Sequence, residues 1–193
     1  MLGYSELYRL EYSVRIDVTR TLAVGLIAVA ALAGQVSAQP MLMAAPTCPA
    51  EAVPLPAGLA GWASKIRLTA ATDAVGLSAA TLTPGKAVDL ALSPTPQVKY
   101  TLRPERPGGS VSSGGMVAFT VPSAGTYRVA LGSAAWIDVV RDGTSLASAA
   151  HGQGPACSGI RKMVDFALQP GGYVLQIVGN GTPTAPVMVA RLP

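Results

Sequence analysis

The residue with the widest range of possible chemistry is His151, the single histidine of the chain. It lies in the glycine-rich segment 149–159 (AAHGQGPACSG), and Arg161 and Lys162 follow this segment closely. Imidazole and thiolate groups are good copper and zinc ligands, and glycines allow a ligand to approach the backbone closely. The sequence therefore marks His151, Arg161 and Lys162 as a possible ligand loop, with His151 as the metal ligand if there is a metal.

Two cysteines, Cys48 and Cys157, are the only ones in the chain. Two cysteines in an exported protein indicate one disulfide, which here would join a proline-rich arm to the segment that contains His151. The alternative is two free thiols or a metal site. An oxidised Cys157 is not a metal ligand, so we expect no cofactor, with copper or zinc bound at His151 as the alternative.

The remaining composition argues against several functional classes. A hydrolytic triad would have to use His151, and the chain has no G-x-S-x-G motif. Only seven acidic residues follow position 38, which leaves few paired carboxylates for glycoside cleavage. The net charge of +4 comes from scattered basic residues rather than a basic face, so we expect no nucleic-acid partner. We therefore predict no catalytic residues.

The first 38 residues have the features of a secretory signal peptide. Arg20 precedes an apolar run at 21–34, and Val36 and Ala38 occupy the small-residue positions of a cleavage site. The run is shorter than the roughly 20 apolar residues of a membrane span. A translation start near residue 18 would give a more typical leader. The sequence thus predicts a periplasmic or secreted protein that meets the membrane only during export.

The rest of the chain divides into a proline-rich arm at 39–62 and a β-domain at 63–193. Short segments of alternating apolar and polar residues recur between Gly- and Pro-containing turns, a pattern typical of half-buried strands. This spacing predicts an all-β, two-sheet antiparallel β-sandwich of jelly-roll or immunoglobulin-like kind, with no helix longer than about two turns. The expected strands are Ser64–Ala70, Ala87–Leu92, Val98–Leu102, Met116–Val121, Thr126–Leu131, Ala135–Arg141, Ile160–Leu168, Tyr173–Val178 and Val187–Leu192.

A weak internal repeat supports this fold class. The segment from Phe119 to Tyr127 (FTVPSAGTY) is echoed, one residue shorter, from Phe166 to Tyr173 (FALQPGGY). Each copy reads as the end of a strand, a Pro/Gly turn and the start of the next strand. We interpret the copies as two equivalent hairpins of one sandwich.

The pattern F-x-V-P-x-x-G-x-Y-x-V-x-L, followed by W-I-D-V-V-R-D-G, resembles the bacterial pre-peptidase C-terminal domains over about residues 110–180. That resemblance implies an exported β-sandwich involved in binding or secretion. Many such domains hold calcium through several aspartates; only Asp138 and Asp142 fall in the segment W-I-D-V-V-R-D-G, which makes a calcium site doubtful.

The pattern His151-x5-Cys157…Ile160-Arg161-Lys162-x-Val164-x-Phe166 is similar to short exported proteobacterial proteins, some of which are labelled homogentisate dioxygenases. An iron oxygenase of that kind needs two histidines and a carboxylate, and this chain has one histidine. Only a second protomer could supply another.

Taken together, these features predict an exported, non-catalytic binding or structural module whose partner is a protein, a peptide or a saccharide. The alternative is a small periplasmic copper- or zinc-binding protein that uses His151. An enzyme such as a dioxygenase is the remote third possibility.

Overall fold

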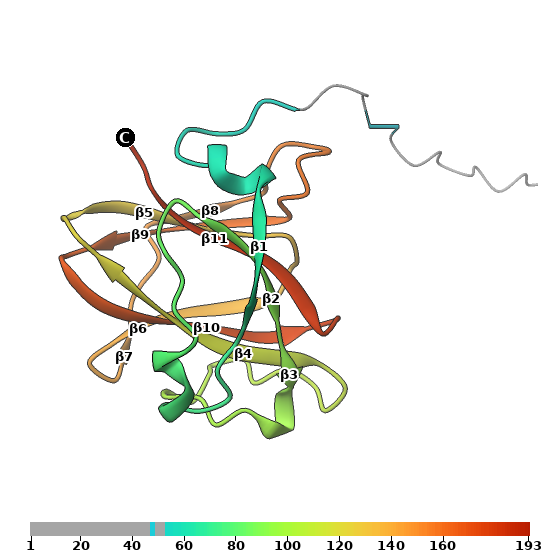
Figure 1. Ribbon diagram of the computed structural model, residues 1–193, viewed down its shortest axis with the longest axis vertical. Helices are drawn as coiled ribbons and strands as arrows, with labels where there is room; N and C mark the ends of the chain where they lie inside the picture. Colours follow the sequence, from blue (N-terminus) through green and yellow to red (C-terminus); the bar gives the residue numbers. More distant parts are fainter. Residues whose placement is uncertain (1–46, 49–52) are drawn as a thin grey trace, which may run out of the picture. The chain divides into compact units, whose positions relative to one another are not determined.

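A computed structural model describes residues 47–48 and 53–193, and these form a sandwich of two β-sheets (Figure 1). The predicted signal peptide at 1–38 and much of the predicted arm lie outside the described residues. The six-stranded sheet has the order β1-β2-β11-β5-β9-β8, and the five-stranded sheet has the order β3-β4-β10-β6-β7. The strands are β1 (Lys65–Thr69), β2 (Ala87–Ala91), β3 (Ser93–Pro94), β4 (Ser113–Val121), β5 (Gly125–Leu131), β6 (Trp136–Arg141), β7 (Thr144–Ser145), β8 (Ala150–Gly152), β9 (Lys162–Leu168), β10 (Gly171–Asn180) and β11 (Thr184–Arg191).

The predicted fold class is confirmed. All pairings within the two sheets are antiparallel except that of β1 with β2, which is parallel. The described helices are three 3-10 turns, η1 (Ala60–Ala63), η2 (Val75–Ser78) and η3 (Thr95–Gln97). None of the described helices has the length and apolarity that a membrane span requires.

The alternating strand pattern places one apolar row of each sheet in a shared core. On β9, the predicted inward face contributes Val164, Phe166 and Leu168, all of which are buried. They join a cluster that includes Phe119 and Leu175 from the opposite sheet. Burying each such side chain contributes about 1.5–3 kcal/mol, so this two-sided core holds the sheets together.

The predicted strand Val98–Leu102 is wrong. This segment belongs to a strap (residues 98–106) that crosses the outer face of the five-stranded sheet and is held mainly by side-chain contacts. The buried amide of Gln176 accepts from Thr101 Oγ1 at 2.9 Å and from Leu102 N at 3.1 Å, and it donates to Leu102 O at 3.0 Å. The Tyr100 hydroxyl donates to Ile177 O at 3.0 Å. Apolar and polar residues alternate in this segment, as in a strand, because one of its sides faces the sheet. No neighbouring strand of the described region forms a ladder of backbone hydrogen bonds with it.

The interpretation of the internal repeat as two hairpins is also wrong. Each turn is an arch that crosses from one sheet to the other: β4 pairs with β10, and β5 pairs with β9. The two copies consequently pair with each other, so that Phe119 lies opposite Tyr173 and Phe166 lies opposite Tyr127. The Phe119 and Tyr173 rings stack with centroids 5.4 Å apart.

This pairing extends to a third strand in each copy. The unit β4-β5-β6 interlocks with the unit β9-β10-β11, because the middle strand of each unit lies between the outer strands of the other. Arg191 on β11 lies opposite Tyr127, and Arg141 on β6 donates to the Tyr173 hydroxyl at 3.0 Å. The two units are therefore related by an approximate twofold axis, which makes Phe119 equivalent to Phe166, Tyr127 to Tyr173 and Arg141 to Arg191.

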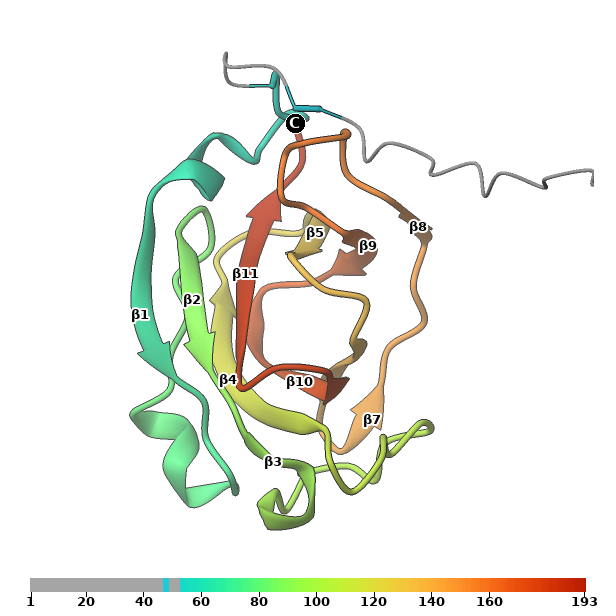
Figure 2. The same cartoon turned by 90° about the vertical axis from the view of Figure 1, so that its right-hand side faces the viewer.

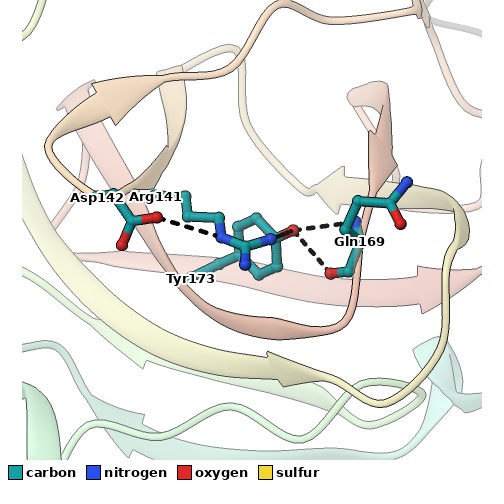
Figure 3. A network of polar contacts seen from close by, with 4 residues as sticks. All are labelled: Arg141, Asp142, Gln169 and Tyr173. Carbon is teal, nitrogen blue, oxygen red and sulfur yellow. Dashed lines mark hydrogen bonds and ion pairs between the residues drawn. The ribbon is translucent and has the colours of Figure 1, made fainter.

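Both tyrosines fasten their arches in the same way. Tyr127 Oη donates to Ser123 O at 3.0 Å, and Tyr173 Oη donates to Gln169 O at 2.7 Å. These bonds to a carbonyl four residues upstream match the tyrosine corner of Greek-key sandwiches. The Tyr173 hydroxyl also accepts from Gln169 N and from Arg141, as Figure 3 shows. The second arch is thus held by a larger polar network than the first.

The predicted disulfide joins Cys48 to Cys157. The next residue after Cys157 is Ser158, and its carbonyl oxygen accepts a hydrogen bond from the Trp62 indole at 3.0 Å. Leu59 and Trp62, which the sequence places in the arm, are buried in a second core cluster on the outer face of the six-stranded sheet. Two residues that precede β1, Cys48 and Trp62, therefore secure the segment that follows β8.

Candidate functional site

A pocket of about 720 Å³ lies where the edges of the two sheets meet on one side of the sandwich. Strands β6 and β7 form one wall, and β8 and β9 form the other; Figure 2 shows the chain passing from β7 to β8 on this side. The volume is within the range of about 300–1,000 Å³ that is typical of small-molecule sites. The lining residues are Glu105, Trp136, Ile137, Asp138, Ser145, Leu146, Ala147, Ser148, His151, Lys162, Val164 and Phe166.

The two sides of the sandwich differ in how they are closed. On the side opposite the pocket, isolated backbone bridges join Ala71 to Met116 and Thr81 to Ala118, so the segment between β1 and β2 is tied to β4. On the pocket side the sheets end in the two-residue strand β7 and the three-residue strand β8, whose residues are exposed. The short edge strands leave room that longer strands would fill.

Asp138 is the most unusual residue of the pocket. It is only 7% exposed, and its Oδ1 accepts hydrogen bonds from the Trp136 indole at 3.1 Å and from Ser145 Oγ at 3.4 Å. Its Oδ2 is buried and has no partner among the described residues. No cation of the described region forms an ion pair with it. A buried carboxylate usually has such a partner, so Asp138 retains an unused capacity to accept hydrogen bonds.

Two cations lie over the ring of Trp136, whose indole N–H is bonded to Asp138. The Arg106 guanidinium lies 4.9 Å from the indole centroid, and Lys162 Nζ lies 5.5 Å from it. Lys162 reaches across from β9 and donates to Ala135 O at 2.9 Å, which joins the two walls. Burial lowers the pKa of Lys162, and the charge of Arg106 lowers it further. An anion at this end would relieve the repulsion between the two cations.

The charge of Asp138 also affects the pKa of Tyr100 in the strap. Burial of the phenol raises its pKa to about 12, the Thr95 side chain acts in the opposite direction, and Asp138 raises the pKa further. The tyrosine therefore stays neutral, and its hydroxyl donates a hydrogen bond to Ile177 O. This bond helps to hold the strap, and thus Glu105 and Arg106, beside the pocket.

The structure brings together two of the three predicted loop residues. His151 on β8 and Lys162 on β9 both line the pocket, whereas Arg161 is exposed and is not among the lining residues. Cys157 is in the disulfide, so it does not join His151 as a thiolate ligand. Within residues 47–48 and 53–193, no three His, Cys, Asp or Glu side chains are grouped so as to hold a metal.

The approximate twofold symmetry provides an internal comparison for Asp138. The row Met116–Gln176–Asp138 crosses the outer face of the five-stranded sheet, and the equivalent row of the other sheet is Met163–Ala130–Met188. Met188 is fully buried in the second apolar cluster. The fold therefore accepts an apolar side chain at this position, and the acid of β6 is not required by the architecture.

Trp136, Asp138 and Arg106 are not among the site residues predicted from the sequence. Asp138 was considered only as a calcium ligand. A usable signal was nevertheless present, because an acid within the apolar strand sequence WIDVV interrupts a buried run. The position of Arg106 could not be read from the sequence, since it depends on the strap crossing the sheet.

Comparison of the sequence with models of known protein families and with curated proteins gives no match. The function is therefore inferred from the geometry of the site.

Proposed function

We propose that the chain is an exported, non-catalytic binding module that takes a small polar ligand in the pocket between β6–β7 and β8–β9. The observation that carries this proposal is Asp138, which lines the pocket and whose buried carboxylate has an oxygen without a partner among the described residues. Such a group destabilises the unliganded fold by about 1–3 kcal/mol. A ligand that donates a hydrogen bond to it recovers this free energy on binding.

The arrangement favours binding over catalysis. The hydroxyl of Ser145 donates to Asp138, and no described serine forms a hydrogen bond with the His151 side chain, so the nucleophile–base contact of a hydrolase is not formed. Lys162 is bound to a backbone carbonyl and lies beside Arg106. The pocket thus offers an acceptor, donors and an apolar wall, which are the elements of recognition.

The disulfide supports an oxidising compartment. A cross-link between Cys48 and Cys157 persists in the periplasm or outside the cell, and it is uncommon in reducing compartments. The predicted signal peptide at 1–38 indicates the same compartment. We therefore place the binding module in the periplasm or in the secreted fraction.

The test is a ligand screen by NMR on the purified, oxidised protein. Ligands that occupy the pocket shift the Trp136 indole resonance and the amides of β6 and β8. Asp138→Asn, which keeps the shape but removes the charge, should weaken binding at least tenfold. Trp62→Phe, which changes the other tryptophan outside the pocket, serves as the matched control and should leave affinity unchanged. A screen of amino acids, peptides and sugars in which no compound moves these resonances would contradict the proposal.

A further inference from the structure

The polar groups of the pocket are divided by charge, and this division is the basis of a further inference, which rests on the proposed function. At the acidic end Asp138 accepts from the Trp136 indole N–H, and at the basic end Lys162, which lines the pocket, and Arg106 of the neighbouring strap lie over the indole ring. Glu105, next to Arg106 in the strap, also lines the pocket. We infer that the pocket binds a small zwitterion, an α-amino acid or a short peptide with an apolar side chain. Its ammonium group bonds to Asp138, and its carboxylate bonds to Lys162 and Arg106.

The acidic end selects a donor that carries positive charge. Within the described region, Asp138 accepts two hydrogen bonds on Oδ1 and none on Oδ2, and no cation of that region forms an ion pair with it. A neutral hydroxyl would satisfy the oxygen but would leave the buried charge unbalanced, whereas an ammonium group does both.

Access to this oxygen requires a small movement, because Oδ2 is shielded from solvent. The Ser145 hydroxyl makes the longer of the two bonds to Asp138, at 3.4 Å, and Ser145 belongs to the exposed two-residue strand β7. Few contacts hold so short an edge strand. A ligand donor can therefore replace Ser145 on Oδ1 without disturbing the core, and this movement of β7 opens the way to the rest of the carboxylate.

The basic end selects an anion. An ammonium group has three donors, and Lys162 uses one of them on Ala135 O. Arg106 forms no ion pair within the described residues, and its guanidinium lies over the Trp136 ring. Both cations lie over the indole, where a neutral sugar would have to stack. A carboxylate fits between these free donors, so the basic end favours a zwitterion over a neutral saccharide.

The apolar wall gives room for the rest of the ligand. Ile137, Val164 and Phe166 belong to the main core and also line the pocket, and Leu146 packs against the same core. Aliphatic side chains of an amino acid or dipeptide gain from burial against this wall. The volume of about 720 Å³ admits either a free amino acid or a short peptide.

The experiment is calorimetric titration of the oxidised protein with leucine, leucyl-leucine, leucine amide, N-acetylleucine, glucose and glucuronate. Leucine or leucyl-leucine should bind, and the better of the two identifies the source of the zwitterion. Loss of the ammonium in N-acetylleucine, or of the carboxylate in leucine amide, should weaken binding at least tenfold.

Two variants assign each end. Asp138→Asn should weaken leucine binding at least tenfold but leave the weak binding of N-acetylleucine unchanged. Lys162→Met should weaken leucine binding likewise but leave leucine amide unchanged. Equal affinity for leucine, its amide and its acetyl derivative would overturn the inference. Binding of glucose or glucuronate at the Trp136 indole without binding of leucine would also overturn it, while the proposed binding function would stand. If none of the six compounds binds or moves the Trp136 resonance, both proposals fail.

Discussion

Replacing Asp138 by methionine should stabilise the fold while it removes binding. The equivalent residue of the other sheet is Met188, which is fully buried in an apolar cluster. Methionine therefore has a precedent at this position in the same architecture. Sites that serve binding often retain a residue that the fold would not need, at the expense of stability.

The magnitude follows from three contributions. Removing the partnerless Oδ2 of Asp138 relieves about 1–3 kcal/mol, and burying a methionine side chain adds about 1.5–3 kcal/mol. Losing the bonds from Trp136 and Ser145 costs about 1 kcal/mol each at most, because Ser145 is exposed and the indole is only half-buried. With both bonds lost at full cost, we expect Asp138→Met to raise the free energy of unfolding by about 0.5–4 kcal/mol.

The reciprocal variant, Met188→Asp, is the matched control. It places an unpaired carboxylate in an apolar cluster and should lower the free energy of unfolding by at least about 4 kcal/mol. Urea denaturation followed by circular dichroism, with the disulfide intact and an unchanged m-value, measures both effects. If Asp138→Met destabilises the protein by more than about 1 kcal/mol, Asp138 is a structural residue and the reasoning is refuted.

Three further predictions concern the framework around the pocket. Tyr173→Phe should cost about 2–4 kcal/mol and Tyr127→Phe about 1 kcal/mol, because the first hydroxyl makes three hydrogen bonds and the second makes one; equal losses in urea denaturation would contradict this. Reduction of the Cys48–Cys157 disulfide, whose cysteines are 109 residues apart, should remove about 4–5 kcal/mol and lower Tm by about 10 °C or more in calorimetry; an unchanged Tm would mean that the cross-link adds no stability. The pKa of Tyr100 is raised in the folded protein to about 12. Its contribution to the free energy of unfolding is therefore complete below pH 10 and is lost as the pH rises from about 10 to 12. Tyr100→Phe should flatten that part of the profile of stability against pH, and an unaltered profile would show that another group is responsible.

The sequence predicted local features well and long-range pairing poorly. The strands around Phe119, Tyr127, Phe166 and Tyr173 were located because alternation and turn residues act over a few positions. Their pairing was misjudged, because an arch and a hairpin use similar Pro/Gly turns. The strand predicted at Val98–Leu102 is absent for a related reason: the alternation in this part of the strap indicates a buried face but not the presence of a ladder partner.

The site was predicted only in part, because the sequence shows which residues have suitable chemistry but not which distant segments meet. His151 and Lys162 were selected by their chemistry, and the structure brings both to the pocket. Asp138 and Arg106 required knowledge of which segments cover the outer face of the five-stranded sheet. No pattern along the chain gives that information.

The interlocked repeat explains why a pocket forms on one side of the sandwich. The two units bury equivalent tyrosines and place equivalent arginines, Arg141 and Arg191, beside their arches. The segments outside the two units differ between the two sides of the sandwich. One side is closed by the segment between β1 and β2, which bridges to Met116 and Ala118, and the other side has only the short strands β7 and β8. The fold is thus stabilised by what the units share, while the charged groups occur where they differ. An acid replaces the methionine of the other unit on the open side, so the departure from symmetry is itself an argument that this side binds.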